Sequence, residues 1–220
     1  MQFRDNDNKK KMINKLFPYI KEKELVDNLL IDDDSIYYIT PKVISDKITS
    51  IIKYHLKILD ININNAVITD STAGVGGNTI SFGKNFKTVY SIEINTQRYE
   101  YLNNNISIFK LNNVLTYNDN CLNKLNIIDD HDVIFIDPPW ESKESGSYKQ
   151  FLNLRLKIGD LSIENICLNL MNKDKMVKIP AIIVFKLPIN YDLYHFYKQL
   201  ENREIYYYNL FKMIILVIVV

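Results

Sequence analysis

From residue 66 onward, short apolar runs alternate with stretches that have helical spacing, and this alternation limits the possible folds more than any other feature. The apolar runs are rich in Val, Ile and Tyr, which is typical of strands that are buried on both faces. Repeated strand and helix units predict an α/β fold with a doubly wound, mostly parallel sheet. The expected strands are residues 66–69, 89–94, 114–117, 133–136 and 182–185.

The last part of this region breaks the alternation. Residues 205–210 and 213–220 are two apolar runs with a tight turn between them and no helix, which predicts a C-terminal antiparallel β-hairpin. The hairpin would add an antiparallel strand to the otherwise parallel sheet. Thr40, before Pro41, is expected to cap the first helix of the core. The expected core helices are residues 41–59, 97–108, 162–171 and 191–200, with another that starts near Asn78.

The residues before Pro41 form a separate pattern. Apolar residues between 12 and 20 follow helical spacing, and residues 25–30 repeat it. A solvated acidic turn at 32–34 and a short extended piece at 36–39 are expected after them. A chain of 220 residues suits one domain with a small extension. We therefore expect residues 1–40 to be an N-terminal helical extension and residues 41–220 to be the core.

The strand at 133–136 is followed by Asp137-Pro138-Pro139-Trp140, whose residue types suit the binding of a base that carries an amine. Neither proline can donate to a sheet, so the chain must leave the sheet as a stiff loop. The Asp137 carboxylate and the Pro138 carbonyl are both acceptors, which suits an exocyclic amine, and Trp140 offers a face for base stacking. Ligands of open α/β sheets bind beyond the carboxyl ends of the strands. The motif alone is also compatible with a surface turn and a core tryptophan.

A glycine-rich loop, Asp70 to Asn78, follows the first strand and opens a helix. Gly74 and Gly76 lack side chains where the backbone must turn sharply and approach a ligand, although an ordinary tight turn has the same composition. The loop lacks the GxGxxG and GK[ST] patterns, which disfavours a dinucleotide or a triphosphate. Acids follow the next two strands at Glu93 and Asp119, and Glu93 has the spacing of a ribose-binding acid. A ribose, an adenine amine and a sulfonium fit these acids, so S-adenosylmethionine is the expected cofactor.

Charge and cysteine content exclude several other classes of function. The formal net charge is +1, so no general attraction to nucleic acid is expected and an RNA substrate would be held locally. Cys121 and Cys167 have no metal-ligand spacing, so no metal is expected, and the start of the chain lacks a signal-peptide pattern. The apolar run at 213–220 is too short to span a membrane. We expect an intracellular monomer, cytoplasmic or nuclear and not secreted.

At this point the motifs resemble those of a known family. Gly-Val-Gly-Gly-Asn-Thr-Ile at 74–80, followed by Asp-Pro-Pro-Trp at 137–140, resembles the trimethylguanosine synthases, which methylate the exocyclic N2 amine of 7-methylguanosine RNA caps. The resemblance covers nearly everything after residue 15. It implies a Rossmann-like class I methyltransferase fold, S-adenosylmethionine as cofactor, and capped RNA or a cap analogue as substrate. Further similar positions are Leu16-Phe17, residues 38–41, Asn104-Asn105, Leu187-Pro188 and the terminal hairpin.

The resemblance also implies roles for individual residues. Phe17 in the extension would close over the cofactor, Asn105 would face the guanine, and Trp140 would stack on it. Thr40, together with Lys9 to Lys11, would meet the cap phosphates. The catalytic residues would be Asp137, Pro138 and Trp140. The cofactor would contact Phe17, Thr40, Asp70, Gly74, Glu93, Asp119 and Asp137.

Three positions depart from the family pattern. This chain has Asp137 where the family commonly has serine, and an acid there is familiar in other amino-methyltransferases. It has Tyr38 where serine is favoured for phosphate contact, and Ile189 where an arginine is usual. Lys186 could replace the arginine's charge but not its bidentate geometry, and it is expected among the substrate-binding residues with Trp140, Asn105 and Thr40.

Two other functions share many of these features. An exocyclic-amine methyltransferase acting on DNA or rRNA bases would share the Asp-Pro-Pro-aromatic motif and the cofactor, but it usually needs a target-recognition domain or a broad basic face. A non-catalytic cap-binding scaffold would keep the fold, but the presence of Gly74, Glu93, Asp119 and Asp137 argues against it. A titration with S-adenosylmethionine would separate the scaffold from the enzymes. The sequence does not distinguish one methyl transfer from two.

Overall fold

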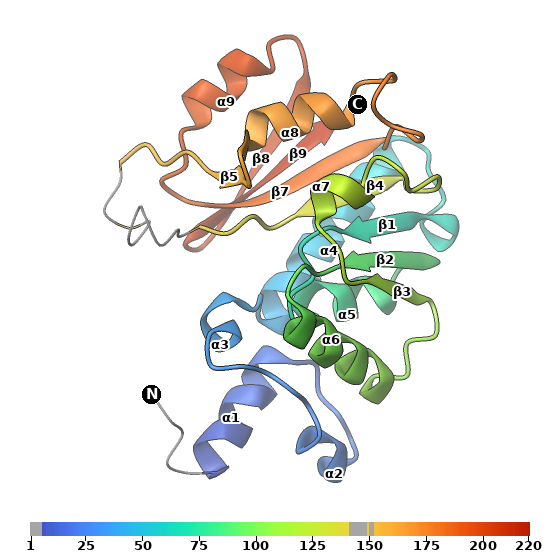
Figure 1. Ribbon diagram of the computed structural model, residues 1–220, viewed down its shortest axis with the longest axis vertical. Coiled ribbons are helices and arrows are strands. Elements are labelled where there is room, and N and C mark those ends of the chain that lie inside the picture. Colours follow the sequence, from blue (N-terminus) through green and yellow to red (C-terminus); the bar gives the residue numbers. More distant parts are fainter. Residues whose placement is uncertain (1–5, 141–148, 150–151) are drawn as a thin grey trace. The chain divides into compact units, whose positions relative to one another are not determined.

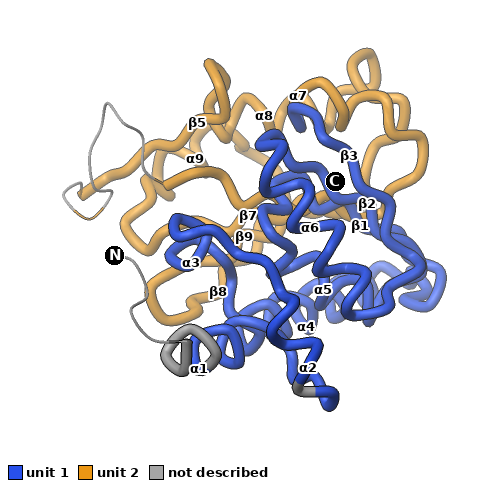
Figure 2. The backbone as a smooth tube through the Cα atoms, turned by 60° about the horizontal axis from the view of Figure 1, so that its bottom comes forward, with its two compact units in different colours: residues 1–121 blue, residues 122–220 orange. Residues whose placement is uncertain are grey.

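The computed structural model of the protein describes residues 6–140, 149 and 152–220. The chain forms two compact units, Met1–Cys121 and Leu122–Val220, which Figure 2 distinguishes by colour. The strands follow the order β3-β2-β1-β4-β7-β9-β8 in a seven-stranded sheet, and Figure 1 labels the elements along the chain. The predicted α/β fold with antiparallel C-terminal strands is therefore confirmed.

The first unit carries three parallel strands, β1 (Val67–Asp70), β2 (Thr88–Ile92) and β3 (Val114–Tyr117). β2 lies between the other two strands and pairs with both. Every residue of β1 is buried, as expected for a parallel strand that is covered on both faces. The helices around these strands are α4 (Lys42–Ile58), η1 (Ile63–Asn65), α5 (Gly77–Gly83) and α6 (Thr96–Ile108), and α7 (Cys121–Lys124) follows β3.

The start of α4 differs from the prediction. The helix begins at Lys42 and its N-cap is Pro41, which makes no side-chain capping hydrogen bond. Thr40 was expected to be the cap, but its buried hydroxyl instead accepts a hydrogen bond of 3.0 Å from Nδ2 of Asn78. The Thr40 side chain therefore fastens the entry to α4 to the start of α5.

Between residue 6 and α4 lie three helices: α1 (Asn6–Leu16), α2 (Lys23–Val26) and α3 (Ser35–Tyr38). The prediction of an extended piece at 36–39 is wrong. A carboxylate oxygen of Asp32 accepts a hydrogen bond of 3.0 Å from the Ser35 N–H, and the other oxygen accepts one from the Ser35 hydroxyl. Such local bonds from an aspartate favour a helical turn over an extended chain.

The second unit carries β4 (Val133–Ile136), β7 (Ile182–Pro188), β8 (Glu204–Leu210) and β9 (Met213–Val219). β4 and β7 are parallel, while β9 runs antiparallel to β7 on one side and to β8 on the other. The predicted C-terminal hairpin is therefore confirmed. The helices are α8 (Ile163–Leu170) and α9 (Leu193–Gln199), and a small hairpin of β5 (Lys157–Ile158) and β6 (Leu161–Ser162) was not predicted.

Within the part of the chain that the structure describes, no helix has the length and apolar character needed to cross a membrane.

Candidate functional site

The glycine loop between β1 and α5 is held in place by close packing and by backbone bonds. Gly76 is the N-cap of α5 and has φ of 105°, a left-handed conformation that favours glycine. A Cβ on Gly77 would lie 2.8 Å from the carbonyl oxygen of Thr40 and 2.7 Å from Ile39. No side chain fits at residue 77, because the segment before α4 passes directly over it.

Glu93, just after β2, points its carboxylate at this loop. Oε2 accepts a hydrogen bond of 2.8 Å from the Gly74 N–H, and Oε1 accepts one of 2.8 Å from the Asn95 N–H. Two backbone donors therefore fix the orientation of a carboxylate that is only 8% exposed. An ionised carboxylate offers about four lone-pair positions, so a group held in this way can still accept hydrogen bonds from the hydroxyls of a ribose.

Asp70, the last residue of β1, and Asp119, two residues after the end of β3, lie in different surroundings. Asp70 is fully buried and accepts a hydrogen bond of 2.7 Å from the Thr79 hydroxyl, which also lies 3.0 Å from the Ser91 hydroxyl. Asp119 is partly exposed and accepts a hydrogen bond from the N–H of Asn120 at 2.7 Å. Asp70 thus links β1 to α5, while Asp119 stays accessible at the edge of the sheet.

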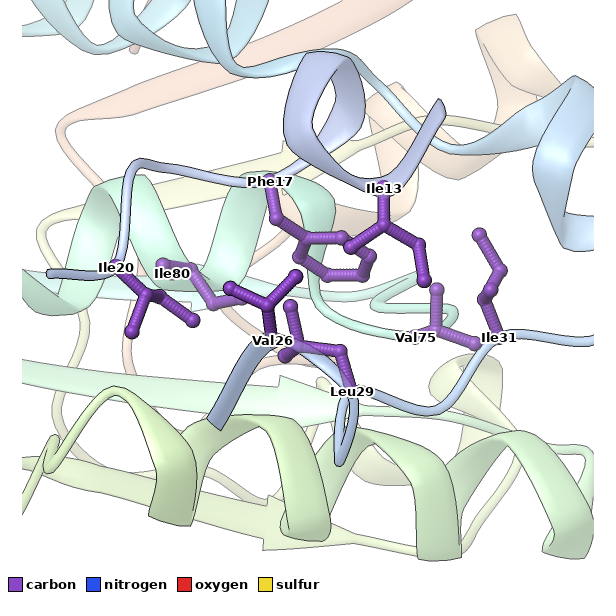
Figure 3. Close-up of a cluster of buried hydrophobic side chains, with 8 residues drawn as sticks. All are labelled: Ile13, Phe17, Ile20, Val26, Leu29, Ile31, Val75 and Ile80. Atoms are coloured by element: carbon purple, nitrogen blue, oxygen red, sulfur yellow. The ribbon is translucent and has the colours of Figure 1, made fainter. Parts of the chain in front are cut away.

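Phe17 lies inside an apolar cluster that joins the N-terminal helices to the glycine loop. Figure 3 shows its ring among side chains that include Ile13, Val75 and Ile80. The ring is 2% exposed and also stacks on Phe109, with centroids 6.4 Å apart. Since Val75 belongs to the loop itself, this cluster holds the N-terminal segment against the part of the unit predicted to bind the cofactor.

Asn105 of α6 makes structural hydrogen bonds that the sequence did not indicate. Its buried amide accepts a hydrogen bond from the N–H of Leu30 and donates to the carbonyls of Leu30 and Val75, each at 2.9 Å. The side chain therefore fastens both the N-terminal segment and the glycine loop to α6. This differs from the contact with guanine that the resemblance implied, because Asn105 is 0% exposed.

Arg98, in the first turn of α6, holds the same N-terminal segment through Asp32. The guanidinium donates to both oxygens of Asp32 at 3.3 Å and lies 3.6 Å from Asp34. Burial opposes ionisation of Asp32, but the bonds from Ser35 and Arg98 outweigh it, and the pKa of Asp32 lies below its ordinary value. The acidic turn at 32–34 is thus partly an anchor rather than wholly solvated.

In the second unit, Asp137, Trp140 and Lys186 form one connected group. Asp137 follows β4, and its Oδ2 lies 2.6 Å from the ammonium of Lys186 in β7. The same ammonium lies over the Trp140 ring, 4.7 Å from its centroid, and the indole N–H donates to the Lys186 carbonyl at 3.3 Å. Pro138 is buried and Trp140 is partly buried. Lys186 is 5% exposed, so it is engaged here instead of reaching outward for a phosphate.

The other residues expected near the cap phosphates differ in their exposure to solvent. Tyr38 is 58% exposed and Ile189 is 51% exposed, so both present their side chains to solvent. Thr40 is 3% exposed, and its hydroxyl is already bonded to Asn78. Lys11 is exposed, while the side chains of Lys9 and Lys10 fall outside the described residues.

The chain is similar in sequence to a known protein family. The RNA cap guanine-N2 methyltransferase family matches residues 65–210, which include the glycine loop, the acids and the Asp-Pro-Pro-Trp motif. The chain belongs to this family. The methyltransferase is also 41% identical to an uncharacterised protein of Acanthamoeba polyphaga mimivirus over 221 residues, covering 92% of this chain and 83% of the relative.

Solved structures share the fold of this methyltransferase at low sequence identity. An rRNA methylase from Streptococcus thermophilus has a TM-score of 0.51 at 12% identity, covering 76% of this chain and 93% of that one. A proposed methylase from Haemophilus influenzae has a TM-score of 0.51 at 17% identity, with 80% and 97% covered. The fold is that of the S-adenosylmethionine-dependent, Rossmann-like class I methyltransferases.

The described residues of the methyltransferase fit S-adenosylmethionine. Glu93 presents a fixed carboxylate for ribose hydroxyls, and a Cβ built on Gly74 would meet nothing within 4 Å, so the loop leaves space beside it. Oδ1 of Asn78 is a buried acceptor with no hydrogen-bond partner among the residues that the structure describes. A buried acceptor without a partner is costly unless a ligand supplies a donor. Asn78 was missed as a candidate, although it stands inside the Gly-Val-Gly-Gly-Asn run.

Proposed function

We propose that this protein transfers a methyl group from S-adenosylmethionine to the exocyclic N2 amine of 7-methylguanosine RNA caps. The observation that carries the proposal is the group formed by Asp137, Trp140 and Lys186 in a chain of the cap guanine-N2 methyltransferase family. In this group, the Asp137 carboxylate would accept hydrogen bonds from the amine, and the Trp140 ring would stack on the base. The proposed enzyme acts as a monomer on capped RNA, and without a metal ion.

The cofactor would be held by residues of the first unit. Glu93 would accept hydrogen bonds from the ribose, and Asp119, at the accessible edge, would accept from the adenine amine. Gly74 would let the backbone approach the ligand, and Asp70 would keep α5 in place beneath the loop. Phe17 and Thr40 would enclose the cofactor, in keeping with their packing against Val75 and Asn78. Residues 1–40 would form the extension that closes over the active site, and residues 41–220 the methyltransferase core.

The proposed reaction is a direct displacement. When bound, S-adenosylmethionine supplies a methyl group that its sulfonium has already activated. Asp137 and the Pro138 carbonyl would accept the hydrogens of the N2 amine and direct its lone pair toward that methyl group. Because correct positioning supplies most of the acceleration, no strong base is required.

Trp140 would select the substrate. The 7-methylguanine ring is cationic, so stacking on the indole adds a cation–π term of roughly 1–2 kcal/mol to ordinary stacking. Plain guanine is neutral and would lack this term. The site would therefore prefer a 7-methylated cap over unmethylated guanosine nucleotides.

The test is mass spectrometry of products after incubation with isotope-labelled S-adenosylmethionine. We expect 7-methyl-GTP and 7-methyl-GDP to gain methyl groups on N2 and GTP to gain none. Equal turnover of GTP would contradict the cap assignment, and methylation of adenine or guanine in DNA or rRNA oligonucleotides in place of caps would favour the nucleic-acid enzymes. No calorimetric binding of S-adenosylmethionine would favour a non-catalytic scaffold.

A further inference from the structure

Lys186 contacts both Asp137 and Trp140. Its ammonium is 2.6 Å from Oδ2 of Asp137 and 4.7 Å from the centroid of the Trp140 ring. Its backbone carbonyl accepts the indole N–H at 3.3 Å. The carboxylate and the ring are therefore each tied to the same residue of β7.

The surroundings of Lys186 restrict the movement of its side chain and its backbone. Its side chain is 6% exposed and that of Asp137 is 15% exposed, so neither charge is screened well by water. A buried ammonium is stable only when it is paired, and removal of its partner leaves an uncompensated charge. Lys186 also stands in the middle of β7 and pairs with Ile215 of β9, so its backbone cannot shift without disturbing the sheet. Lys186 contacts the indole at its N–H and at one face.

We propose that Lys186 is a positioning residue for methyl transfer: it holds the Asp137 carboxylate and the Trp140 ring in fixed orientations for the amine and the base. A base would then stack on the face of the indole opposite the ammonium. This proposal rests on the proposed function for its substrate, but the geometry it claims can be measured without any ligand.

Trp140 is the single tryptophan of the chain, so its fluorescence reports this contact directly. Lys186→Met keeps the length of the side chain and removes the charge. Lys186→Arg keeps the charge and can both pair with a carboxylate and stack on an aromatic ring. Lys198→Met is the matched control, since Lys198 is an exposed residue of α9 in the same unit.

In the absence of ligand, Lys186→Met should shift the Trp140 emission maximum and increase the mobility of the ring in fluorescence anisotropy. Lys186→Arg should stay close to the parent protein, and Lys198→Met should not differ from it. Unchanged emission and anisotropy in a folded Lys186→Met variant would overturn the proposal, because the ring would then not depend on the lysine.

Kinetics provide the second measurement. With 7-methyl-GTP, Lys186→Met should lower kcat/KM by about ten- to a hundred-fold, the size expected when reacting groups lose their alignment. The KM for S-adenosylmethionine should stay within about two-fold, since the lost contacts concern the base and its amine. Lys186→Arg should recover most of the loss. Equal losses in both variants, or a loss confined to the cofactor KM, would contradict a positioning role.

If the Lys186→Met variant does not fold, the double variant Asp137→Ser/Lys186→Met is measured in its place. The double variant removes both charges, so no unpaired carboxylate remains buried, and its Trp140 emission should still differ from the parent. Parent-like emission in that variant would also overturn the proposal. If the parent protein does not methylate caps, the proposed function fails while the fluorescence comparison still decides whether Lys186 holds the ring.

Discussion

Replacing Asn105 with leucine should loosen the N-terminal segment and destabilise the first unit. The substitution keeps the side-chain size but removes the hydrogen bonds to the N–H and carbonyl of Leu30 and to the carbonyl of Val75. A buried backbone group that loses its partner costs roughly 1–3 kcal/mol. The groups of Leu30 can partly reach water when the segment lifts away, so we expect a total loss of about 3–5 kcal/mol.

The loss would be measured as the free energy of urea unfolding followed by circular dichroism. Native-state hydrogen exchange would locate it: the Leu30 amide, which Asn105 binds, should lose protection, and the Gly74 amide, which Glu93 binds, should keep it. Gln97→Ala on the same helix is the control. Its amide donates to the Tyr101 hydroxyl at 2.9 Å at an exposed site, and its removal should cost less than about 1 kcal/mol.

A loss below about 1 kcal/mol for Asn105→Leu, with the Leu30 amide still protected, would refute the reasoning. The apolar cluster around Phe17 would then suffice to hold the segment, and the amide bonds would be dispensable. A loss of the expected size without any change at Leu30 would place the destabilisation elsewhere in the unit.

Three further predictions concern the proposed site and the pH dependence of stability. Trp140→Ala should weaken binding of a 7-methylguanosine cap analogue by about 1–3 kcal/mol in calorimetry, whereas Asp137→Ala should mainly lower kcat. If the Trp140→Ala variant binds the analogue like the parent, the ring serves only to pack the core. Glu93→Ala should weaken S-adenosylmethionine binding by roughly 1.5–3 kcal/mol for each charge-assisted bond lost and leave cap affinity nearly unchanged. A loss of cap affinity with unchanged cofactor binding would mean that the two ligands are assigned to the wrong residues. Burial holds the pKa of His131 below its ordinary value of 6.5, so the unfolded chain takes up that proton first and stability falls as pH drops below 6.5. His131→Gln should therefore lose less unfolding free energy than the parent between about pH 7.5 and about pH 5.5, and parallel curves would remove His131 as a contributor.

The strands and most core helices could be predicted from local sequence patterns, because an apolar run between turn residues is compatible with few secondary structures. The run at 133–136 became β4, and the paired runs at the end of the chain became the β8–β9 hairpin. The helical turn at Ser35 was not predicted, because it depends on hydrogen bonds with Asp32 that the spacing of apolar residues does not reveal. The two-residue strands β5 and β6 were too short to carry any period.

The candidate site was predictable in its residue types and less so in its contacts. Glu93 was expected from its spacing after the glycine loop, and the structure places its carboxylate on that loop. The contacts of Lys186 and Asn105 could not be foreseen, since each depends on pairing between residues far apart in sequence. Lys186 meets Asp137 across 49 positions, and Asn105 meets Leu30 across 75. No short motif encodes such separations.

The place of β9 has a consequence for how the protein is made. Residues 213–219 insert between two strands that are synthesised earlier, pairing with β7 along one edge and β8 along the other. Until they leave the ribosome, the edge of β7 has no partner from this hairpin, and an unpaired apolar edge can bind other chains. Residues Ile214 to Ile218 are all 0% exposed once in place. Substitutions that weaken the pairing of β9, such as Leu216→Lys, would therefore reduce the yield of folded protein at synthesis as well as the stability of the finished protein.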